Sequence, residues 1–219
     1  MLKLMDKENK LYILLALYVG ALYAANLLGG KLMPLGFGNR GLTVSIIIFP
    51  FLFLITDIVG EVYGRKKAKM FVTAGLISLC VLLFWQLFSI SVPAAYPSEW
   101  FIAYTDSYQM VFEMSITFTI ASILAFFFGQ YVDVITYHFF KKKHKEKHMW
   151  IRNNVSTIVG QFIDTNIWMF IAFLPRLWDG SLGIGVMFVT MIIPYWLAKV
   201  IVAAIDTPLA YLGVSWLKK

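Results

Sequence analysis

The sequence predicts an all-helical, polytopic membrane protein, and its composition, segment lengths and loop charges all favour this fold class. Hydrophobic residues make up 60% of the 219 and charged residues only 14%, and the mean hydropathy is +0.75. A soluble domain of this size does not need so many apolar residues. Because backbone polar groups in lipid must be satisfied within the protein, apolar spans of this length are helices.

Six segments hold the roughly 20 mainly apolar residues that a membrane-spanning helix needs. They are 11–30, 42–61, 70–92, 112–139, 155–175 and 184–213. The hydrophilic stretches between them are too short for a second globular domain, so residues 1–219 are expected to form a single six-helix transmembrane domain. The longest outward connection, residues 93–111, is expected to be an interfacial loop or a short helix with aromatic anchors.

The basic residues predict the orientation of the chain in the membrane. Most of the 19 lysines and arginines lie before the first span, between the second and third, between the fourth and fifth, and after the sixth. Loops rich in these residues stay in the cytoplasm, so both termini are expected there. The net charge of +7 lies mainly in these loops, where insertion and anionic lipid explain it. The charge therefore implies contact with the lipid bilayer and no nucleic-acid partner.

The first two spans carry polar residues that lipid disfavours. Asn26 is expected to face the bundle interior, because Gly29 and Gly30 nearby favour close helix packing. Asp57 and Glu61 in the second span are four residues apart and share one helix face. Glu61 is close enough to the surface to pair with a basic residue or to act in gating or coupling, and the sequence leaves both open. Asp57 lies a turn deeper, where a charge is costly and usually functional.

A pentapeptide of the form Gly-Gln-aromatic-aliphatic-Asp occurs at 129–133 in the fourth span and again at 160–164 in the fifth. A basic loop joins these spans, so they run antiparallel and both copies lie at the same depth. Small residues at four-residue spacing let the two helices approach closely. The Gln and Asp of each copy are therefore expected to face those of the other, as two walls of one site. These residues are Gln130, Asp133, Gln161 and Asp164.

The sixth span places Lys199 near its middle, and a lysine at that depth needs an anion. The candidate anions are Asp57, Asp133, Asp164 and Asp206. Two interpretations stay open: a structural ion pair, or a lysine whose charge is held or released according to substrate or proton occupancy. Pro194 and Pro208 lack a backbone N–H and either free carbonyls, as the broken helices of carriers do, or kink the helix.

These polar groups are expected to converge between the membrane midplane and the cytoplasmic surface. The predicted substrate-binding residues are Asn26, Asp57, Gln130, Asp133, Gln161, Asp164, Trp168 and Lys199, with Glu61 and Asp206 as candidates for gating or coupling. Carboxylates and amides suit the polar edge of a small, flat, nearly neutral heterocycle, and aromatic rings suit its face. Divalent metals prefer several carboxylates without a lysine, so neither a metal nor a cofactor is expected.

An enzyme is not expected. The single cysteine, Cys80, has no partner for an internal disulfide and no evident catalytic base. No His-Glu-x-x-His motif occurs either.

The second span also carries a family resemblance. Residues 49–57 read FPFLFLITD, and 61–64 read EVYG before a basic cluster. This pattern resembles the second span of the bacterial queuosine precursor transporters, also called the vitamin uptake transporter family. The likeness extends over nearly the whole chain. It continues through Asn26, 129–133, 160–165, Tyr195, Lys199, Thr207, Pro208 and Tyr211.

The resemblance implies a six-span importer in the bacterial inner membrane. Its expected substrates are 7-deazaguanine compounds, namely the 7-cyano and 7-aminomethyl forms or queuine, which are salvaged for the queuosine modification of tRNA. The sequence leaves open whether the chain works alone or as a homo-oligomer. An alternative class is the substrate-binding subunit of an energy-coupling-factor importer for vitamins or nucleobases, which has a similar size and needs an energising partner.

Overall fold

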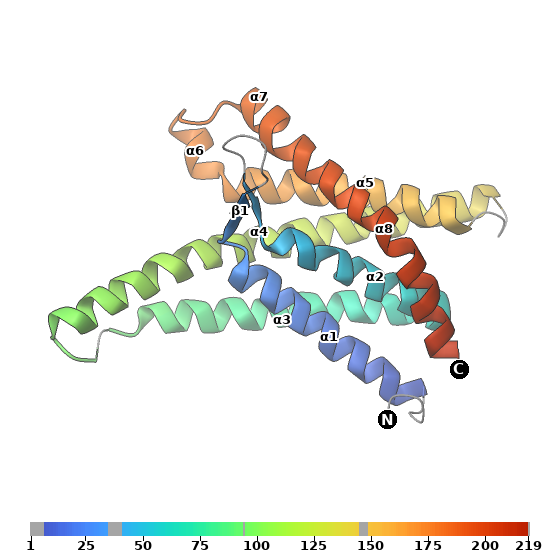
Figure 1. Cartoon of the computed structure of the whole chain (residues 1–219), viewed down its shortest axis with the longest axis horizontal. Coiled ribbons are helices and arrows are strands. Elements are labelled where there is room, and N and C mark those ends of the chain that lie inside the picture. The colour runs from blue at the N-terminus through green and yellow to red at the C-terminus, as the bar shows by residue number, and fades with distance from the viewer. Residues whose placement is uncertain (1–6, 35–40, 94, 145–148, 219) are drawn as a thin grey trace.

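The fold was described from a computed structural model, which covers residues 7–34, 41–93, 95–144 and 149–218. For some residues inside these ranges only the backbone is described. Six long helices make up most of the chain (Figure 1): α1 (Lys7–Leu28), α2 (Ser45–Tyr63), α3 (Arg65–Ser91), α4 (Glu99–His144), α5 (Met149–Ala172) and α8 (Ile193–Lys218). Three short helical segments precede α8: α6 (Leu174–Trp178), α7 (Ile184–Met187) and the π-helix η2 (Phe188–Ile192).

The helical fold class is confirmed, and five described helical stretches are long and apolar enough to cross a membrane. They are Lys7–Leu28, Ser45–Tyr63, Lys66–Ser91, Glu99–Gly129 and Ile184–Val202. Helix α5 has 24 residues, but its apolar described part is limited to Ile158–Ala172. The sixth span and the orientation in the membrane therefore stay predictions. The described chain begins and ends at the same end of the molecule (Figure 1).

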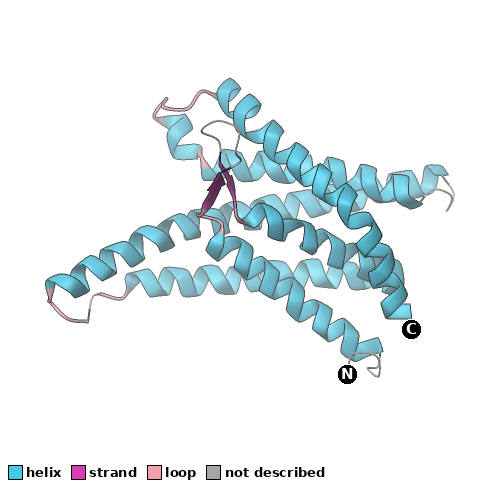
Figure 2. Ribbon diagram, in the orientation of Figure 1, coloured by secondary structure: helices cyan, strands magenta, loops and turns pink. Residues whose placement is uncertain are grey.

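A short antiparallel ribbon corrects the expectation of a purely α-helical chain. Strands β1 (Leu32–Pro34) and β2 (Gly41–Thr43) pair between α1 and α2, with Leu32 opposite Thr43 (Figure 2). Strands of three residues are too short to show an alternating apolar pattern, which is the sequence signal for a strand. The ribbon is followed directly by α2. At this junction the Val44 N–H donates to the Lys31 carbonyl at 2.9 Å.

Helix α4 begins at Glu99, so the expectation of a loop or a separate short helix over 93–111 was wrong for most of that segment. Aromatic rings one helical turn apart contact each other along this extension. Trp100 stacks on Tyr104 at 5.7 Å between ring centroids, and Tyr108 stacks on Phe112 at 4.3 Å. Such i,i+4 contacts favour continuous helix. With 46 residues, α4 is about 69 Å long, which is more than twice the hydrocarbon thickness of a bilayer.

A tight turn joins α2 to α3 at Gly64, where the backbone has φ of +81°. This conformation favours glycine because a Cβ atom would clash. As a result α3 starts at Arg65, five residues before the expected span, and α2 and α3 form an antiparallel pair.

A hydrophobic cluster joins α1, α2, α3, α4 and α8. Tyr18 is fully buried within it, with its ring 5.9 Å from that of Phe71 and 6.4 Å from that of Phe126. Gly75 on α3 lies so close that an added Cβ would sit 2.8 Å from the Tyr18 ring. Many apolar side chains on the outer faces of the helices remain exposed, as expected for surfaces that contact lipid.

The ends of α1 and α8 are tied together near the two termini. The buried Lys10 ammonium donates to the Trp216 carbonyl at 3.1 Å and lies 5.2 Å from the centroid of the Trp216 ring. This carbonyl belongs to the last turn of α8, where a positive charge complements the helix dipole.

The start of α8 is irregular at one of its two prolines. The π-helix η2 ends two residues before Pro194, which cannot donate the backbone hydrogen bond that a regular α-helix requires there. Helix α8 runs on across Pro208 without interruption. The structure thus shows a helical irregularity beside Pro194 and a continuous helix at Pro208.

Candidate functional site

A buried ion pair joins α5 to α8 at the centre of the candidate site. Lys199 Nζ lies 2.8 Å from Asp164 Oδ2, and the two side chains are only 6% and 7% exposed. The Lys199 ammonium also lies 4.7 Å from the centroid of the Phe49 ring on α2. Among the described side chains, Asp164 is the candidate anion that pairs with Lys199.

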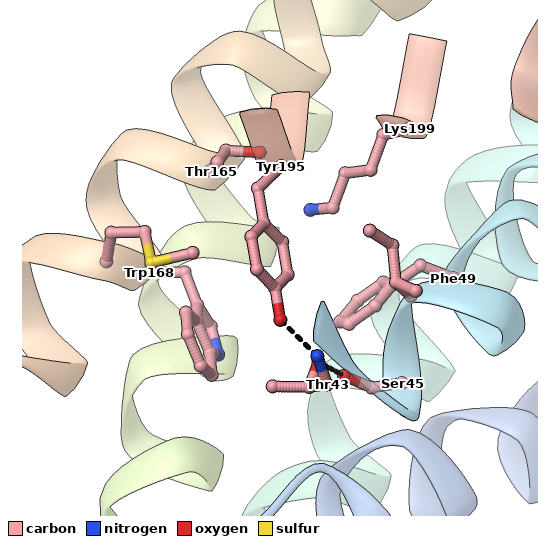
Figure 3. A pocket seen from close by; sticks show the side chains of 9 residues that line it. Thr43, Ser45, Phe49, Thr165, Trp168, Tyr195 and Lys199 are labelled. Carbon is pink, nitrogen blue, oxygen red and sulfur yellow. Dashed lines mark hydrogen bonds between the residues drawn. The ribbon is translucent and has the colours of Figure 1, made fainter. Parts of the chain in front are cut away.

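A small pocket opens beside this ion pair (Figure 3). Its walls come from β2, α2, α5 and α8, and its lining residues are Thr43, Ser45, Ile46, Phe49, Thr165, Trp168, Met169, Tyr195 and Lys199. All of the α2 and α8 contributions come from the first seven residues of each helix. The pocket therefore lies in the half of the bundle that carries the ribbon, away from the chain termini. With the predicted orientation this is the outer half, whereas the sequence favoured the cytoplasmic half.

The pocket is closed at the ribbon by a contact between Tyr195 and Thr43. The backbone N–H of Thr43 donates to the Tyr195 hydroxyl oxygen, and the hydroxyl groups of Thr43 and Ser45 share a hydrogen bond of 2.6 Å (Figure 3). The remaining space admits the centres of water molecules over about 20 Å³. That is enough for one or two waters. A flat heterocycle needs more space than this volume offers.

One face of α5 supplies the polar wall of the site. Gln161, Asp164, Thr165 and Trp168 occupy positions i, i+3, i+4 and i+7 and so lie along one stripe of the helix. Gln161 and Thr165 are each 1% exposed, and the oxygens Gln161 Oε1 and Thr165 Oγ1 have no hydrogen-bond partner among the described residues. Trp168 donates its indole N–H to Ser122 Oγ on α4 at 3.2 Å. The stripe thus carries the acidic member of the ion pair, two side-chain oxygens without a hydrogen-bond partner, and an indole ring held by a hydrogen bond.

Helices α4 and α5 approach closely at the repeated glycines, as the sequence predicted. A Cβ added to Gly129 would lie 2.9 Å from Asp164 Cβ and 3.2 Å from the Gly160 carbonyl oxygen. The glycine of one pentapeptide therefore contacts the aspartate of the other. The side chains of Gln130, Asp133 and Asp206 lie outside the described part of the structure, so their predicted roles stay predictions.

The structure separates Asn26 from the ion pair. Asn26 is buried, and its amide donates to the Leu22 carbonyl at 2.8 Å. The backbone carbonyl of Asn26 accepts a hydrogen bond of 3.1 Å from the Ser115 hydroxyl on α4. The same hydroxyl accepts one of 2.8 Å from the Gln86 side-chain amide on α3. Asn26 thus belongs to a polar cluster of α1, α3 and α4 and does not line the pocket described above.

Two further predicted residues lie toward the other end of α2. Asp57 is half-buried and Glu61 is exposed. Asp57 is eight residues beyond Phe49, which corresponds to about 12 Å along the helix axis. The pocket described here therefore includes neither carboxylate.

Seven of the nine lining residues were not among the predicted site residues: Thr43, Ser45, Ile46, Phe49, Thr165, Met169 and Tyr195. For Phe49 and Thr165 a signal existed in the sequence, because each lies inside a motif that carried the family resemblance. The ribbon residues had no such signal. Within the described ranges, no group of three or more His, Cys, Asp or Glu side chains is placed to hold a metal ion.

The fold and the site define a polytopic membrane protein with a buried polar site inside its helix bundle. Residues 43–213 match the family described as "Putative vitamin uptake transporter", and the chain belongs to this family. It is therefore a multi-pass transport protein of the bacterial cytoplasmic membrane, a class consistent with a non-enzymatic role. A membrane protein of this class handles a small-molecule substrate.

Two named relatives are similar to the chain. A "Probable queuosine precursor transporter" of Bacillus subtilis (strain 168) is 29% identical over 174 residues, which cover 78% of this chain and 72% of the relative. A "Queuosine precursor transporter" of Escherichia coli (strain K12) is 27% identical over 125 residues, which cover 57% of this chain and 52% of the relative. No solved structure gives a significant match.

Proposed function

We propose that this protein carries queuosine precursors across the cytoplasmic membrane as a single six-span domain with both termini in the cytoplasm. The substrates are 7-deazaguanine bases: the 7-cyano form, the 7-aminomethyl form or queuine. The observation that carries the proposal is the buried Asp164–Lys199 pair beside a pocket that Lys199 lines together with mainly aromatic, hydroxyl and apolar side chains. The names of the two relatives support the substrate class.

The chemistry of the pair suits the edge of such a base. A deazaguanine has N–H donors next to a ring carbonyl, so its donors complement the Asp164 carboxylate and its carbonyl complements the Lys199 ammonium. Opening a buried ion pair is costly when a charge is left alone. A ligand that inserts an uncharged heterocyclic edge between the two groups leaves each of them with a partner. This explains how a low-dielectric site exchanges an internal ion pair for a ligand.

The aromatic rings suit the face of the base. Trp168 is held by its hydrogen bond to Ser122 and by Phe118, whose ring centroid lies 5.0 Å from its own. Tyr195 and Phe49 line other parts of the pocket. Rings already held in position lose little conformational entropy when a ligand stacks on them.

The remaining predicted residues have assigned roles in this proposal. Gln161 adds an unused acceptor one turn from Asp164. Gln130 and Asp133 extend the site across the contact between α4 and α5. Asn26 and Asp57 contact the substrate elsewhere on its path, and Glu61 and Asp206 act in gating or coupling.

Replacing Asp164 by Asn is expected to weaken binding of 7-deazaguanines by about tenfold to a hundredfold, because a charge-assisted hydrogen bond contributes about 1.5–3 kcal/mol. The measurement is a ligand titration by thermal shift or calorimetry on detergent-purified protein, with guanine and queuosine as comparison ligands. Asp164→Glu keeps the carboxylate and is expected to retain more affinity. The matched control is Asp106→Asn, at an exposed position on α4. Equal affinities for wild type and Asp164→Asn would remove Asp164 from the site.

Transport by the chain alone separates the two classes of importer. We expect purified protein in liposomes to take up a labelled 7-deazaguanine without ATP and without other proteins. Uptake that requires an added ATPase and a partner membrane subunit would favour the binding subunit of an energy-coupling-factor importer.

Single-cysteine labelling is expected to show the termini on the cytoplasmic side. In a Cys80→Ser background, a membrane-impermeant maleimide added to intact cells should label Asp179→Cys and not Glu8→Cys. Both positions are exposed. Glu8 lies in the first turn of α1 and Asp179 directly follows α6, and the start of α1 and α6 lie at opposite ends of the bundle (Figure 1). Permeabilised cells, in which both variants react, provide the control. Labelling of Glu8→Cys in intact cells would reverse the orientation.

A further inference from the structure

The hydroxyl of Thr165 has no hydrogen bond within its helix, unlike the hydroxyls of several other helical threonines. A threonine inside a helix usually satisfies its hydroxyl by donating to the carbonyl three or four residues earlier. The threonines that do so here are Thr56, Thr73, Thr105, Thr117, Thr119 and Thr190, at distances of 2.7–3.2 Å. Thr165 makes no such bond, although it is equally helical.

The Thr165 hydroxyl is directed into the pocket and not toward its own helix. Thr165 lines the pocket, is 1% exposed, and has no hydrogen-bond partner for Oγ1 among the described residues (Figure 3). A buried hydroxyl without a partner is unfavourable, because it has lost its hydrogen bonds to water and gained none within the protein. The Thr165 hydroxyl could instead donate to the Gln161 carbonyl in its own helix. It does not, so it is left without a hydrogen bond, and a ligand in the pocket would supply the missing partner.

The position of Thr165 in the stripe indicates what it would bind. It follows Asp164 directly, and its hydroxyl can both donate and accept. Across the pocket, the Tyr195 oxygen already accepts from the Thr43 N–H, which leaves the Tyr195 hydroxyl proton available to donate. Asp164 accepts, Lys199 donates, and Thr165 can do either. This set complements a planar ring that carries a donor and an acceptor on neighbouring atoms.

We propose that Thr165 is a specificity-determining residue whose hydroxyl hydrogen-bonds the substrate beside Asp164. The inference rests on the proposed function, since it takes the substrate to be a 7-deazaguanine or another small heterocycle with such an edge. A pocket with this hydroxyl distinguishes guanine-like edges from analogues of the same size that lack the matching polar atom. Sites that hydrogen-bond a substrate group discriminate strongly against ligands without that group, because their own polar atom is then left unpaired.

The test compares Thr165→Val, which removes the hydroxyl at nearly constant shape, with Thr165→Ser, which keeps it. Titration of detergent-purified protein with 7-cyano-7-deazaguanine and 7-aminomethyl-7-deazaguanine is expected to show about a five- to tenfold weaker affinity for Thr165→Val. Thr165→Ser should stay close to wild type. Equal affinities for wild type and Thr165→Val, measured on the same protein that binds the bases, would overturn the inference while leaving the proposed function intact.

A second measurement without ligand keeps the two proposals distinguishable. The control variant is Thr119→Val, because Thr119 is fully buried but donates to the Ser115 carbonyl at 2.8 Å. The melting temperature of ligand-free Thr165→Val is expected to equal or exceed that of wild type, and that of Thr119→Val to fall. A comparable fall for Thr165→Val would mean that its hydroxyl stabilises the empty protein and would also overturn the inference. If wild type binds none of the bases, the proposed function fails, and this comparison decides whether the hydroxyl is held free for a ligand.

Discussion

Replacing Lys199 by Met is expected to lower the free energy of unfolding by about 3–5 kcal/mol and to abolish transport. The substitution removes the ammonium that neutralises Asp164, and both side chains are buried between α5 and α8. A buried charge left without its partner is among the most destabilising changes in a protein interior. Thermal unfolding in detergent, together with uptake in liposomes, measures the two effects.

The double variant Asp164→Leu with Lys199→Met separates stability from function. Replacing both members of a buried ion pair by apolar residues is often neutral or stabilising. We therefore expect the double variant to recover most of the lost stability but no transport, because the ligand no longer finds either charged group. Additive losses from the two single changes, with no recovery in the double variant, would contradict a direct coupling between these side chains. Recovery of transport would show that the pair serves structure alone.

The second large effect is expected at the contact between α4 and α5. Gly129→Ala should lower the free energy of unfolding by about 1–3 kcal/mol, because overpacking a close contact forces the backbone to shift. The added Cβ would lie 2.9 Å from Asp164 Cβ, 3.2 Å from the Gly160 carbonyl oxygen and 3.4 Å from Asp164 Cα. Most of these neighbours are backbone or next to it and cannot rotate away. The two helices must separate, which also displaces the carboxylate and weakens ligand binding.

Gly20→Ala on α1 is the matched control, because a Cβ there meets no atom within 4 Å. Alanine is favoured over glycine inside a helix by about 0.5–1 kcal/mol. We expect this variant to be as stable as wild type or more so, with unchanged binding. Melting temperatures and ligand titrations of both variants test the comparison. If Gly129→Ala behaves like Gly20→Ala, the close packing does not position Asp164.

Much of the fold was predictable because the signals are local. Apolar runs between loops located every long helix, but the starts of α4 and α8 differ from the expected ones by more than a few residues, because α4 extends further and short helical segments precede α8. The aromatic extension of α4 was misjudged because its polar and proline-containing neighbours resemble a loop, whereas its rings form a ladder only once the helix exists. The ribbon of β1 and β2 was missed because strands of three residues leave no periodic pattern.

Only part of the candidate site could be predicted from the sequence, because most residues that line the pocket were not among the predicted ones. The buried ionic and amide residues stood out, because lipid makes such side chains rare. The glycine contact between α4 and α5 followed from small-residue spacing and antiparallel topology. Asn26 was grouped with the ion pair, yet it bonds within a separate cluster with Ser115. Its depth in the membrane was deducible, but the direction it faces depends on how α1 rotates against α3 and α4.

The sequence by itself determined that this chain is a helical membrane protein of a transporter family and that it buries charge. The length of an apolar span and the residues of a motif are local properties of the chain, so both can be recognised from the sequence without the tertiary structure. Only the tertiary structure decided that Asp164 pairs with Lys199 within the described part of the chain, and that Thr165 lines the pocket with an unpartnered hydroxyl. These choices depend on the rotation and closeness of packed helices. That packing depends jointly on segments that are far apart in the chain, because closely packed helices allow few arrangements of the side chains between them.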